Sequence, residues 1–196
     1  MKKIKAILSL IALVAIMASC SIVTPVNATG NTCHIMCFHL HRVRCRWFSH
    51  VFSAFFVGEE GMQYFIKPLI FKSQQKGEEA LPDFTFRYKN EIKDSAIVNI
   101  SIEGPELYKE IDGIAFSNGD EQYELSEVKL LYNSGSKSGY VSRFTAKCSL
   151  EELHKIFMHD CFTITIYSSK KVRVFIPSGK AKKATSMIMK EVFVIM

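Results

Sequence analysis

The chain has 196 residues, of which 48% are hydrophobic and 22% are charged. This length fits one domain with an appendage and excludes two large domains, while the near-globular composition excludes a wholly disordered chain and a polytopic membrane protein. The formal net charge of +6 falls to +3 without Lys2, Lys3 and Lys5, and a surplus this small and dispersed predicts no nucleic-acid partner.

The first twenty residues have the pattern of an export signal. A basic start at residues 1–5 is followed by an apolar run at 6–18 and by small residues. Such a run engages the translocon but is shorter than the roughly 20 apolar residues that a membrane-spanning helix needs. We therefore expect residues 1–19 to be a signal peptide, with a retained transmembrane anchor as the alternative.

Met17-Ala18-Ser19-Cys20 resembles a bacterial lipobox, although Met17 stands where Leu is usual. The resemblance implies that Cys20 becomes the acylated first residue of the mature protein. Each buried CH₂ of an acyl chain contributes about 0.8 kcal/mol, so several chains together anchor a protein permanently. Ser21 after the cysteine implies sorting to the outer membrane by the proteobacterial rule.

Residues 20–32, CSIVTPVNATGNT, resemble the start of the TRL-like family of small bacterial lipoproteins, in which a CxxVTPV-type opening precedes a Gly-rich segment. The resemblance covers residues 1–32 only. Because that family has no established activity, it implies a location in the cell envelope and no reaction.

Residues 33–67 differ from the rest of the chain in composition. Residues 33–50 hold three of the six Cys, four of the six His and the single Trp, and no Lys occurs from 6 to 66. One hypothesis is a metal site, because thiolate and imidazole groups bind zinc and related ions. The spacing of these cysteines and histidines matches no known pattern of a zinc site with four protein ligands. The candidate ligands are Cys33, Cys37, His39, His41, Cys45 and His50.

A second hypothesis for this segment is an amphipathic helix. Large apolar residues recur at helical spacing, and three arginines precede them. Such a helix lies either on anionic lipid or on the protein's own core. The residues in question are Trp47, Phe48, Val51, Phe52, Phe55 and Phe56.

The leading hypothesis is that residues 33–67 are translated in the wrong reading frame. A frameshift explains why Cys, His, Arg and Trp appear together while Lys disappears. In that case residues 83–196 need not be joined naturally to the export signal. An unexceptional tether is the remaining alternative.

From Asp83 the chain becomes regular and predicts a folded domain over residues 83–196, preceded by a lipid-anchored tether over 20–82. Alternating apolar residues and turn signals indicate about eight short strands. The expected strands are 84–88, 96–102, 114–116, 122–125, 128–132, 140–147, 161–167 and 171–176, with a flexible loop at 133–139 and a further edge strand at 192–195.

Two or three helices accompany the strands. Ser149 and Glu152 form a capping box before a helix to about Met158, and Ser178 begins another to about Lys190. A short helical turn is expected at 106–111. The fold class is thus α+β, a mainly antiparallel sheet with two or three helices, preceded by a signal peptide and an irregular or helical N-terminal segment.

No motif in the sequence points clearly to one enzymatic reaction. Ser178-Gly179-Lys180 is a helix cap rather than a phosphate loop, because Ala181 stands in the Ser/Thr position. His154 and His159 lack the spacing of a metalloprotease pair. Cys148 and Cys161 are either joined by a disulfide, worth roughly 2–3 kcal/mol, or are two buried free thiols.

The basic face of the last predicted helix is either a solvated surface or a site for a lipid headgroup or anion. Its residues are Lys180, Lys182, Lys183 and Lys190.

The sequence therefore favours a membrane-anchored envelope lipoprotein with a non-enzymatic binding or structural domain. Its expected partners are the membrane and an envelope protein or glycan, and no cofactor is expected. The alternative is a hydrolase or lectin-like domain acting on glycans or the cell wall, which exposed aromatic residues around Tyr132 and Tyr140 would support.

Overall fold

A computed structural model describes residues 46–75, 77–88, 95–119, 121–137, 139–159, 161–169 and 171–195. These residues form one twelve-stranded sheet, in which every pairing is antiparallel, and two α-helices. The strands are β1 (Arg46–Phe48), β2 (Phe52–Phe56), β3 (Met62–Ile66), β4 (Phe71–Ser73), β5 (Glu79–Tyr88), β6 (Ser95–Gly104), β7 (Gly113–Asn118), β8 (Glu121–Glu124), β9 (Ser126–Ser136), β10 (Gly139–Ser149), β11 (Thr163–Ser168) and β12 (Lys171–Pro177). The helices are α2 (Leu150–Phe157) and α3 (Gly179–Glu191), with short 3-10 turns η1 (Gly58–Glu60) and η2 (Phe193–Ile195).

Strand β5 is the centre of the sheet. One edge pairs with β6, which continues through β10 to β9. The other edge is shared, because β3 pairs with the second half of β5 and β4 pairs with its start. From β3 the sheet continues to β2 and β1, and from β4 it continues through β12, β11 and β7 to β8.

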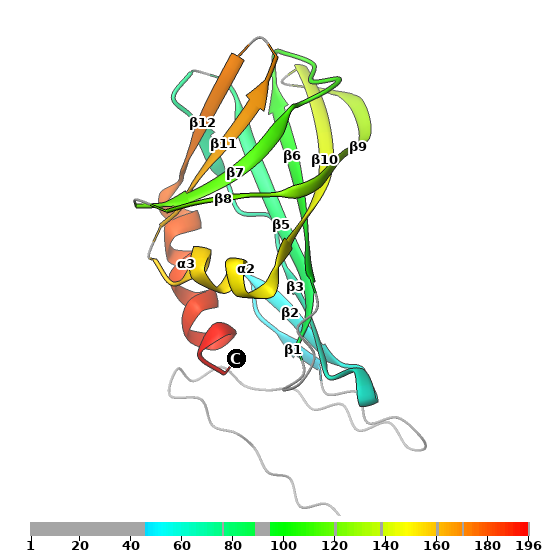
Figure 1. Cartoon of the computed structure of the whole chain (residues 1–196), viewed down its shortest axis with the longest axis vertical. Helices are drawn as coiled ribbons and strands as arrows, with labels where there is room; N and C mark the ends of the chain where they lie inside the picture. Colours follow the sequence, from blue (N-terminus) through cyan, green and yellow to red (C-terminus); the bar gives the residue numbers. More distant parts are fainter. Residues whose placement is uncertain are drawn as a thin grey trace, which may run out of the picture. The chain divides into compact units, whose positions relative to one another are not determined.

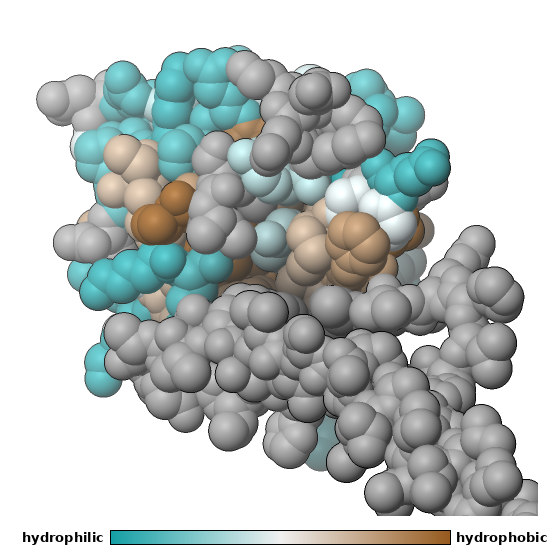
Figure 2. All heavy atoms as spheres, turned by 90° about the horizontal axis from the view of Figure 1, so that it is seen from below, coloured by the Kyte–Doolittle hydropathy of each residue, from teal (hydrophilic) through white to brown (hydrophobic). Residues whose placement is uncertain are grey.

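The sheet curls into a half barrel, and α2 and α3 lie together at its lower end (Figure 1). Alternate residues of the long strands point into the curl: β5 and β10 both alternate between buried and more exposed positions. Residues buried on the inner face of the sheet and on both helices form one continuous hydrophobic core. Seen from below, hydrophobic residues reach the surface of the described part in patches bordered by hydrophilic ones (Figure 2).

Both helices begin at the serines that the sequence indicates. Ser149 and Glu152 form the expected capping box, with the Glu152 amide 3.1 Å from Ser149 Oγ and the Ser149 amide 2.9 Å from Glu152 Oε2. Ser178 Oγ accepts a hydrogen bond from the Ala181 amide at 3.2 Å. These caps satisfy backbone N–H groups that have no partner inside a helix.

Strand β9 is an edge strand that is exposed along nearly its whole length. Two register shifts interrupt its pairing with β10. At the first, Arg143 pairs with Tyr132 and Phe144 with Leu130, so Leu131 is an extra residue. At the second, Glu127 has a left-handed backbone with φ of 52°. β-Bulges of this kind bend a strand and increase its twist.

The predicted fold class is confirmed at the level of a mostly antiparallel sheet with two helices, but the strand count is wrong. The predicted number was about eight, and the described sheet has twelve. The additional strands are β1 to β4, from residues that the sequence analysis placed outside the folded domain. Eight strands, β5 to β12, lie between Glu79 and Pro177.

The amphipathic helix is a second wrong prediction, because residues 46–48 and 52–56 are strands. Phe52 and Ala54 are buried in the same core as the rest of the sheet, and so are Tyr64 and Ile66 on β3. The frameshift hypothesis concerns the coding DNA and stays a prediction.

Three smaller predictions are also corrected. The segment 105–112 contains no helix, the predicted strand at 192–195 is replaced by the end of α3 and the 3-10 turn Phe193–Ile195, and most of the predicted loop at 133–139 belongs to β9 and β10. Among the described residues no helix is both long and apolar enough to cross a bilayer. The predicted signal peptide and Cys20 lie outside the described residues.

Candidate functional site

A pocket of about 320 Å³ lies beside the first half of α3. Its walls come from three parts of the chain: the turn before β2, the segment 67–70 between β3 and β4, and one face of α3. The lining residues are His50, Val51, Lys67, Pro68, Leu69, Ile70, Lys180, Ala181, Lys183, Ala184 and Met187.

The interruption between β3 and β4 shapes one wall of the pocket. Both strands pair with the same edge of β5, and the chain between them leaves that edge over residues 67–70. Pro68 has no N–H to donate, but its neighbours hold the segment in place. The Lys67 amide donates to Val51 O at 2.9 Å and the Leu69 amide to Pro82 O at 2.9 Å. The Ser178 amide donates to Ile70 O at 3.0 Å, which fixes the start of α3 against the segment.

The helix contributes one face to the pocket. Lys180, Ala181, Lys183, Ala184 and Met187 follow the spacing i, i+1, i+3, i+4, i+7, which places them along one side of an α-helix. Ser49 Oγ also lies 3.7 Å from Met187 Sδ, so the turn before β2 contacts the far end of this face.

The described ionisable side chains around the pocket are all basic. Of the lining residues that the structure describes, four are basic, namely Lys67, Lys180, Lys183 and His50, and none is acidic. Over the part of the chain that the structure describes, none of the three lysines forms an ion pair, and Lys67 Nζ donates to Ser49 O at 2.8 Å. No described acidic side chain therefore neutralises this positive charge, and a surface of this kind favours anions.

The base of the pocket is apolar. Val51, Leu69 and Ala181 are buried core residues, and Ala184 and Met187 pack against the core while remaining partly exposed. A concave apolar surface with a few charged groups at its rim is typical of small-molecule sites.

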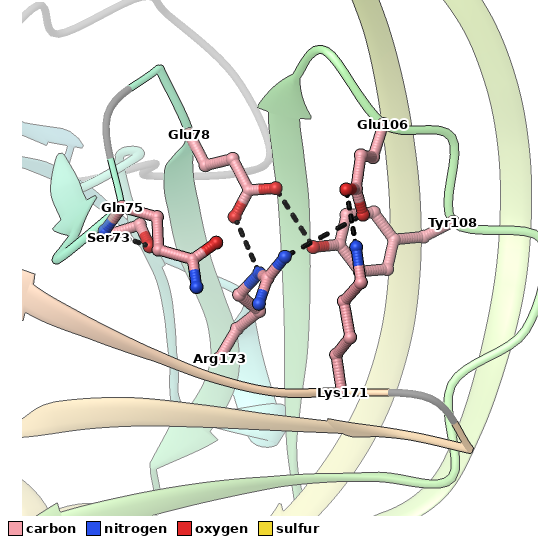
Figure 3. A network of polar contacts seen from close by, with 7 residues as sticks. All are labelled: Ser73, Gln75, Glu78, Glu106, Tyr108, Lys171 and Arg173. Carbon is pink, nitrogen blue, oxygen red and sulfur yellow. Dashed lines mark hydrogen bonds and ion pairs between the residues drawn. The ribbon is translucent and has the colours of Figure 1, made fainter.

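A polar network of five residues fills the opposite, upper end of the half barrel. Its centre is an ion pair between Arg173 on β12 and Glu78 just before β5, with Arg173 Nε 3.1 Å from Glu78 Oε2. These side chains are only 8% and 4% exposed. Figure 3 shows Arg173 reaching between Glu78 and Glu106. The members of this polar network are Glu78, Glu106, Tyr108, Lys171 and Arg173.

The remaining contacts of the polar network tie the segment 105–112 to the sheet. Tyr108 donates its hydroxyl to Glu78 Oε1 at 3.3 Å, and its amide donates to Ser142 Oγ at 3.1 Å. Lys171 Nζ lies 2.6 Å from Glu106 Oε1. Burial, with the nearby Glu78 carboxylate, raises the pKa of Tyr108 to about 12, so the phenol is protonated at neutral pH.

The backbone of β6 packs closely against Glu78 in the polar network. A Cβ added at Gly104 would lie 2.8 Å from Glu78 Cγ, so only glycine lets β6 approach that carboxylate. The nearly complete burial of Glu78 and Arg173 indicates a structural role, because neither side chain is open to a substrate.

The predicted metal ligands are not brought together by the described residues. His50 is exposed at the rim of the pocket. Cys33, Cys37, His39, His41 and Cys45 lie outside the described residues. Within the described ranges, no group of three or more His, Cys, Asp or Glu side chains is placed to hold a metal ion.

Cys148 and Cys161 are both free thiols in this structure. Cys148 is buried, as the alternative of two buried thiols requires, but Cys161 is exposed. Burial raises the pKa of the Cys148 thiol to about 12, with a smaller contribution from the Glu152 carboxylate. Cys148 therefore behaves as a small hydrophobic residue of the core.

The aromatic residues near the β9–β10 hairpin do not form a cluster. Tyr132 and Tyr140 are 50% and 44% exposed. Tyr132 pairs with Arg143, and Tyr140 is three positions before Arg143 on β10, so the two rings lie on opposite faces of the hairpin. A flat sugar-binding platform made from both rings is excluded by this register.

Sequence reasoning found only part of the pocket. It identified Lys180 and Lys183 on a basic helix face and His50 as a ligand candidate, but not Lys67 or the apolar base. Glu78 and Arg173 were missed entirely. The only available signal was that Arg173 has the same strand parity as Phe175, which places it on the buried face of β12.

Comparison of the chain with known proteins found no matching family model, no matching curated protein and no matching solved structure.

Proposed function

We propose that this protein is a membrane-anchored binding protein of the bacterial cell envelope, with no catalytic role, and that it binds an anionic ligand in the pocket beside α3. The observation that carries the binding part is the charge of the pocket. Its lining includes His50, Lys67, Lys180 and Lys183, and no acidic residue is among the lining residues that the structure describes. Lysine ammonium groups act as point charges toward phosphate and other anions.

The envelope location rests on the sequence. The basic start and the short apolar run support export, and the resemblance of Met17-Ala18-Ser19-Cys20 to a lipobox supports acylation at Cys20. An outer-membrane lipoprotein with a small binding domain is the simplest protein with both features.

The binding part is tested by titrating the purified protein with inorganic phosphate at low ionic strength. The readout is the NMR shift of the amides of α3. We expect saturable shifts at residues 180–187, and weaker binding when Lys180→Gln and Lys183→Gln are combined. Glutamine has nearly the helix propensity of lysine, so the helix itself is preserved.

The matched control combines Lys182→Gln with Lys190→Gln. These lysines are exposed on the same helix, and neither lines the pocket. The control removes the same charge, so it should leave phosphate binding nearly unchanged. Equal loss of binding in both double variants would mean that only the net charge of α3 attracts phosphate, and would refute the proposal.

The anchor is tested separately in the native host. Metabolic labelling with a palmitate analogue should mark the protein, and Cys20→Ser should abolish the label and release the protein from the membrane fraction. A Cys20→Ser variant that is still labelled would refute lipidation at this position without affecting the pocket.

A further inference from the structure

We infer that the ligand of the pocket is a small amphipathic anion, with its charged head at the lysines and a short alkyl part on the apolar base. This inference rests on the proposed binding function and adds the chemical class of the ligand. It is drawn from the volume of the pocket, from its polarity and from the arrangement of charged and apolar groups around it.

The pocket has more room than a bare inorganic anion fills. A water molecule takes about 30 Å³ of liquid, so a pocket of about 320 Å³ has room for roughly ten heavy atoms. A phosphate ion has five heavy atoms and would fill about half of the space. The remainder fits an alkyl group of about four or five carbons.

The described lining has a charged part and an apolar part, as the binding of an amphipathic anion requires. Lys180 and Lys183 are exposed and stand at the rim, as do Lys67 and His50. Ala184 and Met187 follow them on the same face of α3, partly exposed and in contact with the core. An inorganic anion would leave this apolar surface in water, whereas an alkyl group would cover it and gain free energy with each CH₂ that it buries.

Within the described part of the lining the cationic side chains are lysines and not arginines, which favours a head group that does not require the planar, bidentate hydrogen bonding of a guanidinium. A phosphate monoester meets this condition, because its oxygens accept hydrogen bonds from several ammonium groups in different directions. Alkyl phosphates are therefore suitable probes.

The test compares inorganic phosphate, butyl phosphate and octyl phosphate by calorimetric titration of the purified protein, below the concentration at which octyl phosphate forms micelles. We expect butyl phosphate to bind about tenfold more tightly than inorganic phosphate, since its chain fits the pocket and is partly buried there. Octyl phosphate should gain little more, because the additional carbons extend beyond the pocket into solvent.

A pair of methionine variants locates the alkyl part. Met187→Gln places a polar side chain on the base of the pocket and should weaken butyl phosphate binding more than inorganic phosphate binding, so that most of the butyl advantage is lost. Met189→Gln is the control, since Met189 lies on the same helix and packs against the core without lining the pocket. Circular dichroism confirms that both variants fold.

The outcomes separate this inference from the proposed function. Equal affinity for the three probes, lost in the Lys180→Gln, Lys183→Gln variant, would overturn the amphipathic ligand and keep an anion-binding pocket. An affinity that rises steadily up to octyl phosphate would also overturn it, because this indicates general hydrophobic adsorption. Binding of none of the probes would overturn the inference and the proposed function together.

The source of the ligand is resolved with vesicles that contain phosphatidylglycerol. Sedimentation with the vesicles that is lost in the Lys180→Gln, Lys183→Gln variant and kept in the Lys182→Gln, Lys190→Gln control would support a membrane lipid as the amphipathic anion. Butyl phosphate binding without vesicle binding would support a soluble one.

Discussion

The two ends of the half barrel are closed in opposite ways. At the lower end, six phenylalanine rings from the sheet, α2 and the C-terminal turn pack against one another, and we call them the aromatic cluster. They are Phe84, Phe86, Phe116, Phe157, Phe162 and Phe193. At the upper end, the interior is occupied by the buried ion pair Glu78–Arg173 and its hydrogen-bond partners. Charged and polar groups therefore stand there in place of aromatic rings.

The two ends differ in what the loss of a single side chain costs in stability. Packing in the aromatic cluster is spread over many weak contacts, so the loss of one ring leaves a cavity whose cost depends on how far its neighbours relax. In the polar network each group depends on a specific partner, and the loss of one leaves a charge buried without compensation. The stability that the lower end contributes should therefore depend on the size and shape of the buried rings. The stability that the upper end contributes should depend on the charges of its side chains, and so on pH.

The largest effect is expected at the lower end. Phe157 is fully buried and its ring lies 5.2 Å from those of Phe84 and Phe193 and 5.4 Å from that of Phe162, measured between centroids. Phe157→Ala should lower the free energy of unfolding by about 4 kcal/mol. Urea denaturation measures this loss.

Phe65→Ala is the control for that substitution, because Phe65 is 41% exposed on the outer face of β3. It should cost less than about 1.5 kcal/mol. Equal losses in the two variants would mean that the aromatic cluster contributes no more than surface contacts.

A slightly smaller loss is expected at the upper end. Arg173→Met leaves the Glu78 carboxylate buried without its partner and should lower the free energy of unfolding by about 3 kcal/mol. Adding Glu78→Gln to Arg173→Met should restore part of this loss, because no unpaired charge then remains in the core. Urea denaturation of the single and double variants gives the coupling.

Arg143→Met provides a matched control on the outer face. Arg143 forms a 2.6 Å ion pair with Asp83, but these side chains are 23% and 15% exposed, so solvent screens the pair. We expect a loss of about 1 kcal/mol. A loss as large as that of Arg173→Met would show that burial is not what makes the polar network sensitive.

A third prediction concerns pH at the upper end. Tyr108→Phe removes the hydrogen bond to Glu78 and should cost about 1 kcal/mol at neutral pH. The pKa of Tyr108 is raised from 10.0 to about 12 in the folded protein, so its contribution is present below pH 10 and is lost as the pH rises toward 12. Unfolding curves across this range should show a steeper loss in the wild type than in Tyr108→Phe. Parallel curves would contradict the assignment.

The smallest effect is a difference in reactivity, not in stability. Iodoacetamide should label Cys161 roughly tenfold faster than Cys148, because Cys148 is buried and its pKa is raised to about 12. Peptide mass spectrometry reads the two sites separately. Phe157→Ala should accelerate labelling of Cys148 if loosening of the lower end exposes β10, whereas Arg173→Met should not. Equal rates at both cysteines in the wild type would mean that Cys148 is not protected by the core.

The parts of the fold that the sequence predicted are those that short-range patterns specify. In β5, Phe84 and Phe86 alternate with polar neighbours, and both are buried as that alternation requires. The capping box at Ser149 likewise depends on residues three positions apart. Neither feature needs information from distant parts of the chain.

Strand β2 was missed because its sequence fits two periods. Phe52, Phe55 and Phe56 have the helical spacing i, i+3, i+4, whereas only Phe52, Ala54 and Phe56 share one face of a strand. The pairing of β2 with β3 decides between them, burying Phe52 and Ala54 and leaving Phe56 at 42% exposure. Pairing of this kind depends on the partner strand, which a local pattern does not contain.

The candidate site was predicted least completely, because its parts are far apart in the sequence. Lys180 and Lys183 are conspicuous on a basic helix, but Lys67 becomes part of the same pocket only through the pairing of β3 and β4 with β5. Glu78 and Arg173 are 95 residues apart and meet for the same reason. In both places the topology of the sheet, not a motif, brings the charges together.

The irregular course of β9 has a consequence for how copies of this protein meet at high concentration. A long, straight, exposed edge strand is a template on which another chain can add its own strand. The additional residue at Leu131 and the left-handed backbone at Glu127 break that template into short pieces. A second copy could follow the edge for only a few residues, so intermolecular sheets and fibrils are disfavoured at this edge.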